Sequence, residues 1–214
     1  MGHYKPVMKI INAFFLFCIL LFICSCKKTE QQSEPNSAFK WFANGTNFHY
    51  DLYTSSGIIK NYETLSVVKN SYTGNLDLTE SAQTDTIGGS LYFEDLQGEY
   101  VVKSDGLYAI TVATCEYHIV DYPTFTSQFL PNNPKVGQQI PVYFCQGDVV
   151  DTINVLALNQ SVTVPYGTFN TYVMQYNYGQ KGYWDPNTGL VMYERFDNNG
   201  NLSGTLKLDN VTRQ

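Results

Sequence analysis

Short segments in which apolar and polar residues alternate dominate the chain from residue 39 onward, and this pattern constrains the fold more than any other feature. Clusters of Gly, Asn, Asp and Pro separate the segments, and in this region no run with a 3.6-residue period exceeds about two helical turns. Successive side chains of a strand point to opposite faces of a sheet, so the alternation is typical of half-buried strands. We therefore predict an all-β fold.

The aromatic content agrees with this prediction. The 214 residues include 17 Tyr, 13 Phe and 2 Trp, whereas only 15% of them are charged. Aromatic side chains fit a pleated, half-buried surface, while helix-rich proteins rely on Ala, Leu, Glu and Lys. The composition also excludes a disordered, collagen-like or strongly basic chain.

Turn residues between the segments predict how the strands connect. Asp185–Gly189 and Asp197–Asn201 carry the Pro, Asn and Gly that hairpin turns require, so the C-terminal third is expected to form a β-meander. We expect a curved antiparallel sheet or half-barrel, with a β-sandwich as the alternative. The predicted strands are Asn47–Tyr53, Glu63–Lys69, Asn75–Glu80, Ser90–Asp95, Tyr100–Lys103, Leu107–Tyr117, Gln139–Phe144, Ile153–Leu158, Gly167–Tyr178, Leu190–Phe196 and Leu202–Asp209.

The N-terminus carries an export signal. Lys5 and Lys9 precede an uncharged, mostly apolar run, Ile10–Ile23, which has the length of a signal-peptide core and is short for a membrane span. The sequence Ile-Cys-Ser-Cys at 23–26 resembles the lipobox of bacterial lipoproteins, which implies that Cys26 receives the lipid. An ordinary secretory signal or an uncleaved transmembrane anchor is the alternative interpretation.

The predicted domains are a signal peptide at 1–25, a polar flexible tether at 26–38 and a single β domain at 39–214. Loss of Lys5 and Lys9 with the signal leaves 11 of the 13 Lys and Arg residues against 19 Asp and Glu, a net charge of −8. This charge argues against binding of nucleic acid. We expect a protein of the Gram-negative cell envelope, in the outer membrane, held by its lipid and facing either the periplasm or the surface.

No catalytic, phosphate-binding or dinucleotide-binding motif occurs in the sequence. His49 and Asp51 share a face of a predicted strand, but their Cα atoms are roughly 6.6 Å apart, and we expect a solvated pair. The pair His118 and Asp121 falls on opposite strand faces, and the acidic cluster Glu94, Asp95 and Glu99 is typical of a solvated turn. We predict no catalytic residue, no metal and no cofactor.

Two kinds of modification are predicted beyond the lipid. Cys115 and Cys145 are the only thiols left after processing in an oxidising compartment, so we expect a disulfide, with two reduced buried thiols as the alternative. The tripeptide Asp-Thr-Ile occurs twice, at 85–87 and 151–153. It resembles the acceptor of a general O-glycosylation system of some Gram-negative envelopes, which makes Thr86 and Thr152 candidate acceptors.

The C-terminal quarter resembles a known family. Gly167-Thr-Phe169 opens an aromatic strand, Gly182-Tyr-Trp184 follows it, and Gly189-Leu-Val191 forms the next hairpin. This order is similar to that of uncharacterised envelope proteins related in shape to the LolA and LolB lipoprotein carriers. The resemblance implies a curved antiparallel half-barrel with a hydrophobic concave face.

An aromatic and methionine stripe lies on the strand after Gly167. Alternation places Tyr172, Met174, Tyr176 and Tyr178 on one face. With Phe169 and Trp184, these residues are candidates for binding an apolar ligand. Such a stripe can equally fill an ordinary core, and the sequence leaves both interpretations open.

Three classes of function remain. The first is a non-catalytic envelope lipoprotein that binds a hydrophobic or amphipathic ligand or an envelope protein partner. The second is a surface glycan-binding accessory that uses exposed aromatic residues, with Tyr53, Tyr72 and Trp184 as candidates. The third is a hydrolase whose carboxylates come together only in the fold. We favour the first, and exposure of Trp184 distinguishes the second.

Overall fold

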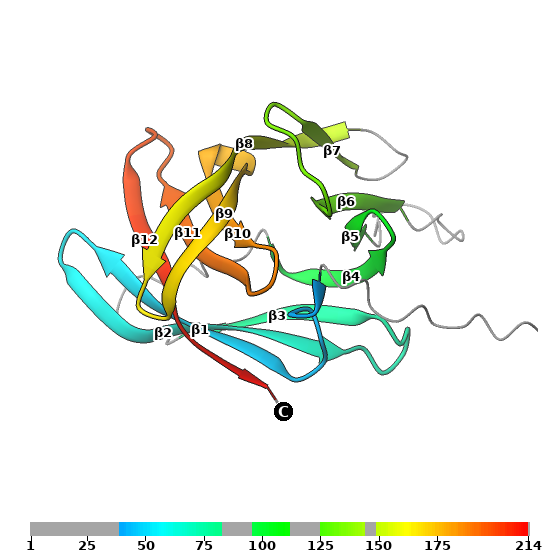
Figure 1. Ribbon diagram of the computed structural model, residues 1–214, viewed down its shortest axis with the longest axis horizontal. Helices are drawn as coiled ribbons and strands as arrows, with labels where there is room; N and C mark the ends of the chain where they lie inside the picture. Colours follow the sequence, from blue (N-terminus) through cyan, green and yellow to red (C-terminus); the bar gives the residue numbers. More distant parts are fainter. Residues whose placement is uncertain (1–38, 83–95, 112–124, 144–148, 214) are drawn as a thin grey trace, which may run out of the picture. The chain divides into compact units, whose positions relative to one another are not determined.

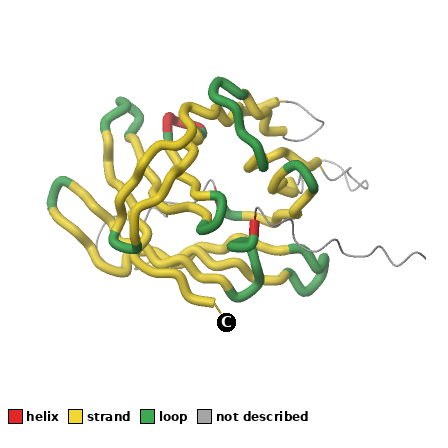
Figure 2. Tube along the Cα trace, viewed as in Figure 1, coloured by secondary structure: helices red, strands yellow, loops and turns green. Residues whose placement is uncertain are grey.

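The computed structural model describes residues 39–82, 96–111, 125–143 and 149–213. Strands make up most of these ranges and helix is limited to short turns (Figure 2). None of these helical turns is of a length and apolarity to cross a membrane. The elements are β1 (Thr46–Thr54), β2 (Gly57–Lys69), β3 (Leu76–Ala82), β4 (Gly98–Lys103), β5 (Gly106–Thr111), β6 (Phe125–Pro131), β7 (Gln139–Tyr143), β8 (Val149–Val164), β9 (Gly167–Gln175), η4 (Asn177–Gly179), β10 (Lys181–Asp185), β11 (Gly189–Phe196) and β12 (Leu202–Arg213).

All the described strands belong to one antiparallel sheet of twelve strands, in the order β6-β5-β4-β3-β2-β1-β12-β11-β10-β9-β8-β7. The sheet curves until its two edge strands, β6 and β7, lie side by side (Figure 1). It is therefore nearly closed into a barrel. The prediction of an all-β, curved antiparallel sheet is confirmed, and the described strands do not form the two sheets of a sandwich.

The two predicted hairpin turns are confirmed. In the turn between β10 and β11, Asp185 Oδ1 accepts the backbone N–H groups of Asn187 at 3.0 Å and Thr188 at 2.7 Å. Gly189 then adopts φ +97°, which is the left-handed conformation that favours glycine. Asp197 caps the turn between β11 and β12 in the same way. The meander β9-β10-β11-β12 follows from these turns.

Several predicted strand limits are wrong. Strands β6 and β10 were not predicted. Strand β6 ends at a proline and has the polar Ser127 on its buried face, while β10 is short and contains Gly182. Strand β8 continues through residues 159–161, which resemble a turn, because the chain absorbs them as a bulge with Asn159 at φ 57°. The predicted strand Ser90–Asp95 lies outside the described residues.

Aromatic side chains fill the interior of the curved sheet. The segment before β1 contributes Trp41, whose ring centroid lies 5.5 Å from that of Phe42 and 5.6 Å from that of Trp184. Trp41 and Trp184 are fully buried, and edge-on and tilted ring contacts of this kind add to the stability gained by burial. The residues that precede the first strand therefore form part of the core.

Candidate ligand-binding pocket

The place where the barrel fails to close is the seam between the edge strands β6 and β7. The two strands form no backbone ladder with each other. Between the described residues of the two strands, one hydrogen bond crosses the seam, from the backbone N–H of Tyr143 to Ser127 Oγ at 2.9 Å. Pro141 in β7 has no N–H to offer, as is typical of an edge strand. The seam is therefore the part of the described sheet with the weakest backbone pairing.

A pocket of about 440 Å³ lies at this seam. Strands β4, β5 and β6 line one side of it, and β7, β8 and the start of η4 line the other. Its volume falls within the usual range for small-molecule sites. The pocket combines an aromatic floor with a polar rim.

The floor consists of Tyr100, Phe129 and Tyr176, which come from three different elements. The ring of Phe129 lies 5.2 Å from that of Tyr100 and 5.8 Å from that of Tyr176, onto which it stacks. Both phenol groups already have partners, because Tyr100 OH donates to Leu96 O at 2.7 Å and Tyr176 OH accepts from Trp184 Nε1 at 2.7 Å. Burial raises the pKa of both tyrosines, so the floor remains uncharged.

The rim carries an inward-facing carboxylate and a buried hydroxyl, those of Asp151 and Ser127. Asp151 begins the inward-facing series that Ile153 and Val155 continue along β8, and it is half-buried. The structure shows no hydrogen bond between the Asp151 carboxylate and another described residue. Glu99 also borders the pocket, but it alternates with the inward Tyr100 on β4, so its carboxylate lies on the outer face and accepts a hydrogen bond from the Asn75 amide at 2.6 Å. Among the described residues that line the pocket, none is a lysine, arginine or histidine.

The predicted ligand residues divide between the pocket and the core. Of the predicted set, Tyr176 alone lines this pocket. Tyr172 and Met174 are buried in the packed interior, and Phe169 is half-buried and stacks on Tyr166. The candidate site thus moves from the middle of β9 to its end, where the strand meets the seam.

Two aromatic predictions require correction. Tyr178 does not continue the stripe on β9, because the strand ends at Gln175 and Tyr178 lies in η4 with φ 55° and 72% of its surface exposed. Trp184 has no exposed surface, so it offers no platform for a sugar. Of the other glycan candidates, Tyr72 is exposed and Tyr53 is half-buried beneath Lys207 Nζ.

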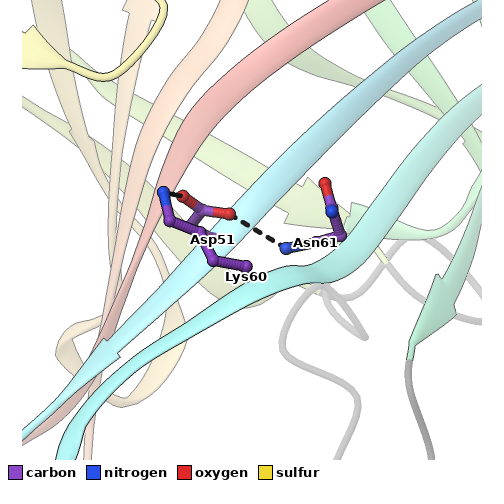
Figure 3. Close-up of polar contacts among 3 residues, drawn as sticks. All are labelled: Asp51, Lys60 and Asn61. Atoms are coloured by element: carbon purple, nitrogen blue, oxygen red, sulfur yellow. Dashed lines mark hydrogen bonds and ion pairs between the residues drawn. The ribbon is translucent and has the colours of Figure 1, made fainter.

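The predicted pair of His49 and Asp51 is not joined. The His49 ring nitrogens lie within hydrogen-bond reach of Thr64 Oγ1 at 3.1 Å and Thr212 Oγ1 at 3.4 Å. Asp51 is fully buried rather than solvated, and it binds Lys60 Nζ and the backbone N–H of Asn61, the latter at 2.9 Å (Figure 3). The register of β1 against β2 shifts at this point, so the carboxylate holds a bulge.

Several predicted site residues lie outside the described residues, namely Cys26, Thr86, Glu94, Asp95, Cys115, His118, Asp121 and Cys145. Thr152 is described and is half-buried on β8, directly after Asp151. Within the described ranges, no group of three or more His, Cys, Asp or Glu side chains is placed to hold a metal ion. Lipidation, glycosylation and the disulfide stay predictions.

Sequence reasoning missed most of this pocket. Tyr100, Ser127 and Phe129 carry no local signal, because each looks like an ordinary strand or loop residue. Asp151 does carry a local signal, because it occupies an inward position of an alternating series whose next inward members, Ile153 and Val155, are apolar and buried. A carboxylate on the buried face of a strand usually has a specific role.

Comparison with known proteins yields two solved structures. No family model matches the chain, and no curated protein matches it. An inferred exported protein with a YmcC-like fold from Bacteroides fragilis is 16% identical, with a TM-score of 0.43 over 84% of this chain and 98% of that one. An inferred lipoprotein from Parabacteroides distasonis is 13% identical, with a TM-score of 0.43 over 84% of this chain and 100% of that one.

Proposed function

We propose that this protein is a non-catalytic lipoprotein of the bacterial cell envelope that binds an amphipathic small molecule in the seam pocket. The observation that carries the proposal is the pocket itself, with three aromatic rings below and polar groups above. Apolar walls with a few polar groups are typical of small-molecule sites. An amphipathic ligand matches both parts, because its apolar portion covers the rings and its polar end reaches the rim.

The envelope part of the proposal rests on the lipobox-like residues 23–26 and the polar tether that follows them. A lipid on Cys26 would hold the barrel at a membrane surface. Metabolic labelling with an alkyne fatty acid should mark the wild-type protein and fail to mark Cys26→Ala. Label that persists on this variant would contradict the anchor.

A lipid-like ligand also agrees with the resemblance of residues 161–208 to envelope proteins related in shape to the LolA and LolB half-barrels. Glycan binding through Trp184 is not part of the proposal, because that side chain is fully buried. An envelope protein partner would need an exposed apolar surface instead of a pocket. Binding of such a partner would not depend on the volume of the pocket, so the pocket-filling variants described below distinguish it from binding of a small molecule.

The test uses the mature chain with Cys26→Ser, which contains every strand of the described sheet. Ala109 lines the pocket, so Ala109→Phe fills it, whereas Ala43 is exposed and Ala43→Phe is the matched control. Val142→Phe fills the pocket from β7 and replaces the first variant if that variant does not fold. Mass spectrometry of organic extracts compares all the proteins after gentle purification.

We expect a co-purifying amphiphile in the parent protein and in Ala43→Phe, and its loss from the filled variants. Thermal unfolding confirms that each variant is folded. Empty extracts from every protein, combined with no binding of added amphiphiles, would overturn the proposal. Retention of the ligand in folded, filled variants would move the binding site elsewhere.

A further inference from the structure

Among the described residues that line the pocket, every charged side chain is acidic. Asp151 shares the inward face of β8 with Ile153, whereas Glu99 of β4 alternates with the inward Tyr100, so its carboxylate lies on the outer face and binds Asn75. The other described polar groups of the rim are neutral, including the Ser127 hydroxyl and the Asn177 amide, and can bond to a head group of either charge. The Asp151 carboxylate therefore decides which charge the rim accepts.

We infer that the seam pocket selects amphiphiles whose polar end is cationic, such as an alkylammonium group, and rejects anionic ones. The inference rests on the proposed function and adds the chemical class of the ligand. A carboxylate or phosphate head would lie beside the Asp151 carboxylate with no described cation to balance it. An ammonium head in the same place would be attracted to this carboxylate.

The aromatic floor contacts the tail of the ligand and carries no charge. Tyr100, Phe129 and Tyr176 pack ring against ring, and the raised pKa values of Tyr100 and Tyr176 keep these two rings neutral. The choice between a cationic and an anionic head group therefore falls to the rim.

Asp151 is the residue that should decide the selectivity. Glu99 already accepts a hydrogen bond from Asn75, whereas the structure records no described partner for the Asp151 carboxylate. Asp151 is also half-buried, so a charge opposite it is screened less by salt than a charge at the open surface. An ammonium ligand would supply the partner that the fold does not.

The test compares two probes that share a twelve-carbon tail, dodecyltrimethylammonium and laurate, on the mature chain with Cys26→Ser. Equilibrium dialysis below the micellar concentration gives a Kd for each probe. Asp151→Asn removes the rim charge, and Asp209→Asn removes the same charge from β12, outside the pocket. Ala109→Phe reports whether each probe occupies the pocket.

We expect dodecyltrimethylammonium to bind at least about tenfold more tightly than laurate, which corresponds to about 1.4 kcal/mol. Asp151→Asn should remove most of this preference, and Asp209→Asn should keep it. Equal binding of both probes that Ala109→Phe abolishes would overturn the charge selectivity and leave the proposed function intact. Failure of both probes to bind in a manner sensitive to Ala109→Phe would overturn the two proposals together.

Discussion

At the residue scale, the interior allows little change where the backbone approaches an aromatic ring. Gly189 has φ +97°, and a Cβ at this position would lie 2.9 Å from two ring atoms of Trp41. Gly200 has a similar φ of +78°, but a Cβ there would meet no atom within 4 Å. The two glycines thus share the same backbone requirement and differ only in the space around them.

Gly189→Ala should be more destabilising than Gly200→Ala. Both variants carry the cost of a side chain at positive φ, while Gly189→Ala adds overpacking against Trp41, which typically costs about 1–3 kcal/mol. Urea unfolding followed by tryptophan fluorescence gives the difference in the free energy of unfolding. Equal losses for the two variants would show that Trp41 does not pack against Gly189.

The buried carboxylate of Asp51 leads to a second prediction at this scale. Asp51→Ala leaves the Asn61 N–H without its acceptor and should cost about 1–3 kcal/mol of stability. Lys60→Ala should cost much less, because the Lys60 side chain is 63% exposed and a surface ion pair contributes little. A larger loss for Lys60→Ala in chemical denaturation would contradict this asymmetry.

At the scale of one element, β9 shows how a strand divides between core and site. Its residues Tyr172 and Met174 lie opposite Trp184 and Gly182 of β10, deep in the packed interior. Tyr176 follows the end of the strand and reaches the pocket floor. One alternating stripe therefore serves packing along the strand and lines the candidate site at its end.

Met174→Ala should cost roughly 2–5 kcal/mol of stability, because it leaves a cavity at a fully buried position. Tyr178→Ala is the matched control, since Tyr178 was assigned to the same stripe and is exposed in η4. Its effect should be close to zero. Chemical denaturation of both variants tests the division, and similar losses for the two would argue against it.

At the scale of the whole molecule, the seam between β6 and β7 is the place where backbone pairing does not close the described sheet. Strand β5 ends at Thr111, four residues before Cys115, and β7 ends at Tyr143, two residues before Cys145. Ser127 of β6 pairs with Ala109 of β5 on one side and accepts the Tyr143 N–H on the other. The last residues of β5 and β7 therefore lie near Ser127, at the same end of the seam.

We expect Cys115 and Cys145 to form a disulfide that ties β5 and β6 to β7 and β8. The bridge encloses 29 residues, for which chain entropy predicts a stabilisation of about 3–4 kcal/mol. Protein purified without reductant should have no alkylatable thiol at these positions, and Cys115→Ser with Cys145→Ser should lower the melting temperature. Two reactive thiols in the unreduced protein would rule the bridge out.

The sequence by itself determined the features that depend on neighbouring residues. Alternation predicted most of the strands, and the Asp, Pro and Gly residues at 185–189 predicted a hairpin turn that the structure confirms. Strand β6 was not predicted, because its inward Ser127 breaks the apolar pattern. Ser127 is buried where its hydroxyl accepts the Tyr143 N–H across the seam. The local alternation of residues cannot predict a hydrogen-bond partner that lies on another strand.

Only the tertiary structure decided where the candidate site lies. Tyr100, Phe129, Asp151 and Tyr176 come from separate elements, and curvature of the sheet brings them together at the seam. Alternation assigns Met174 and Tyr176 to the same face, yet Met174 is enclosed by neighbouring strands while Tyr176 lies where β6 and β7 do not pair. Whether an apolar side chain fills a core or lines a pocket depends on which strands surround it. Those neighbours are decided by the closure of the sheet, which brings together strands that are far apart in the sequence.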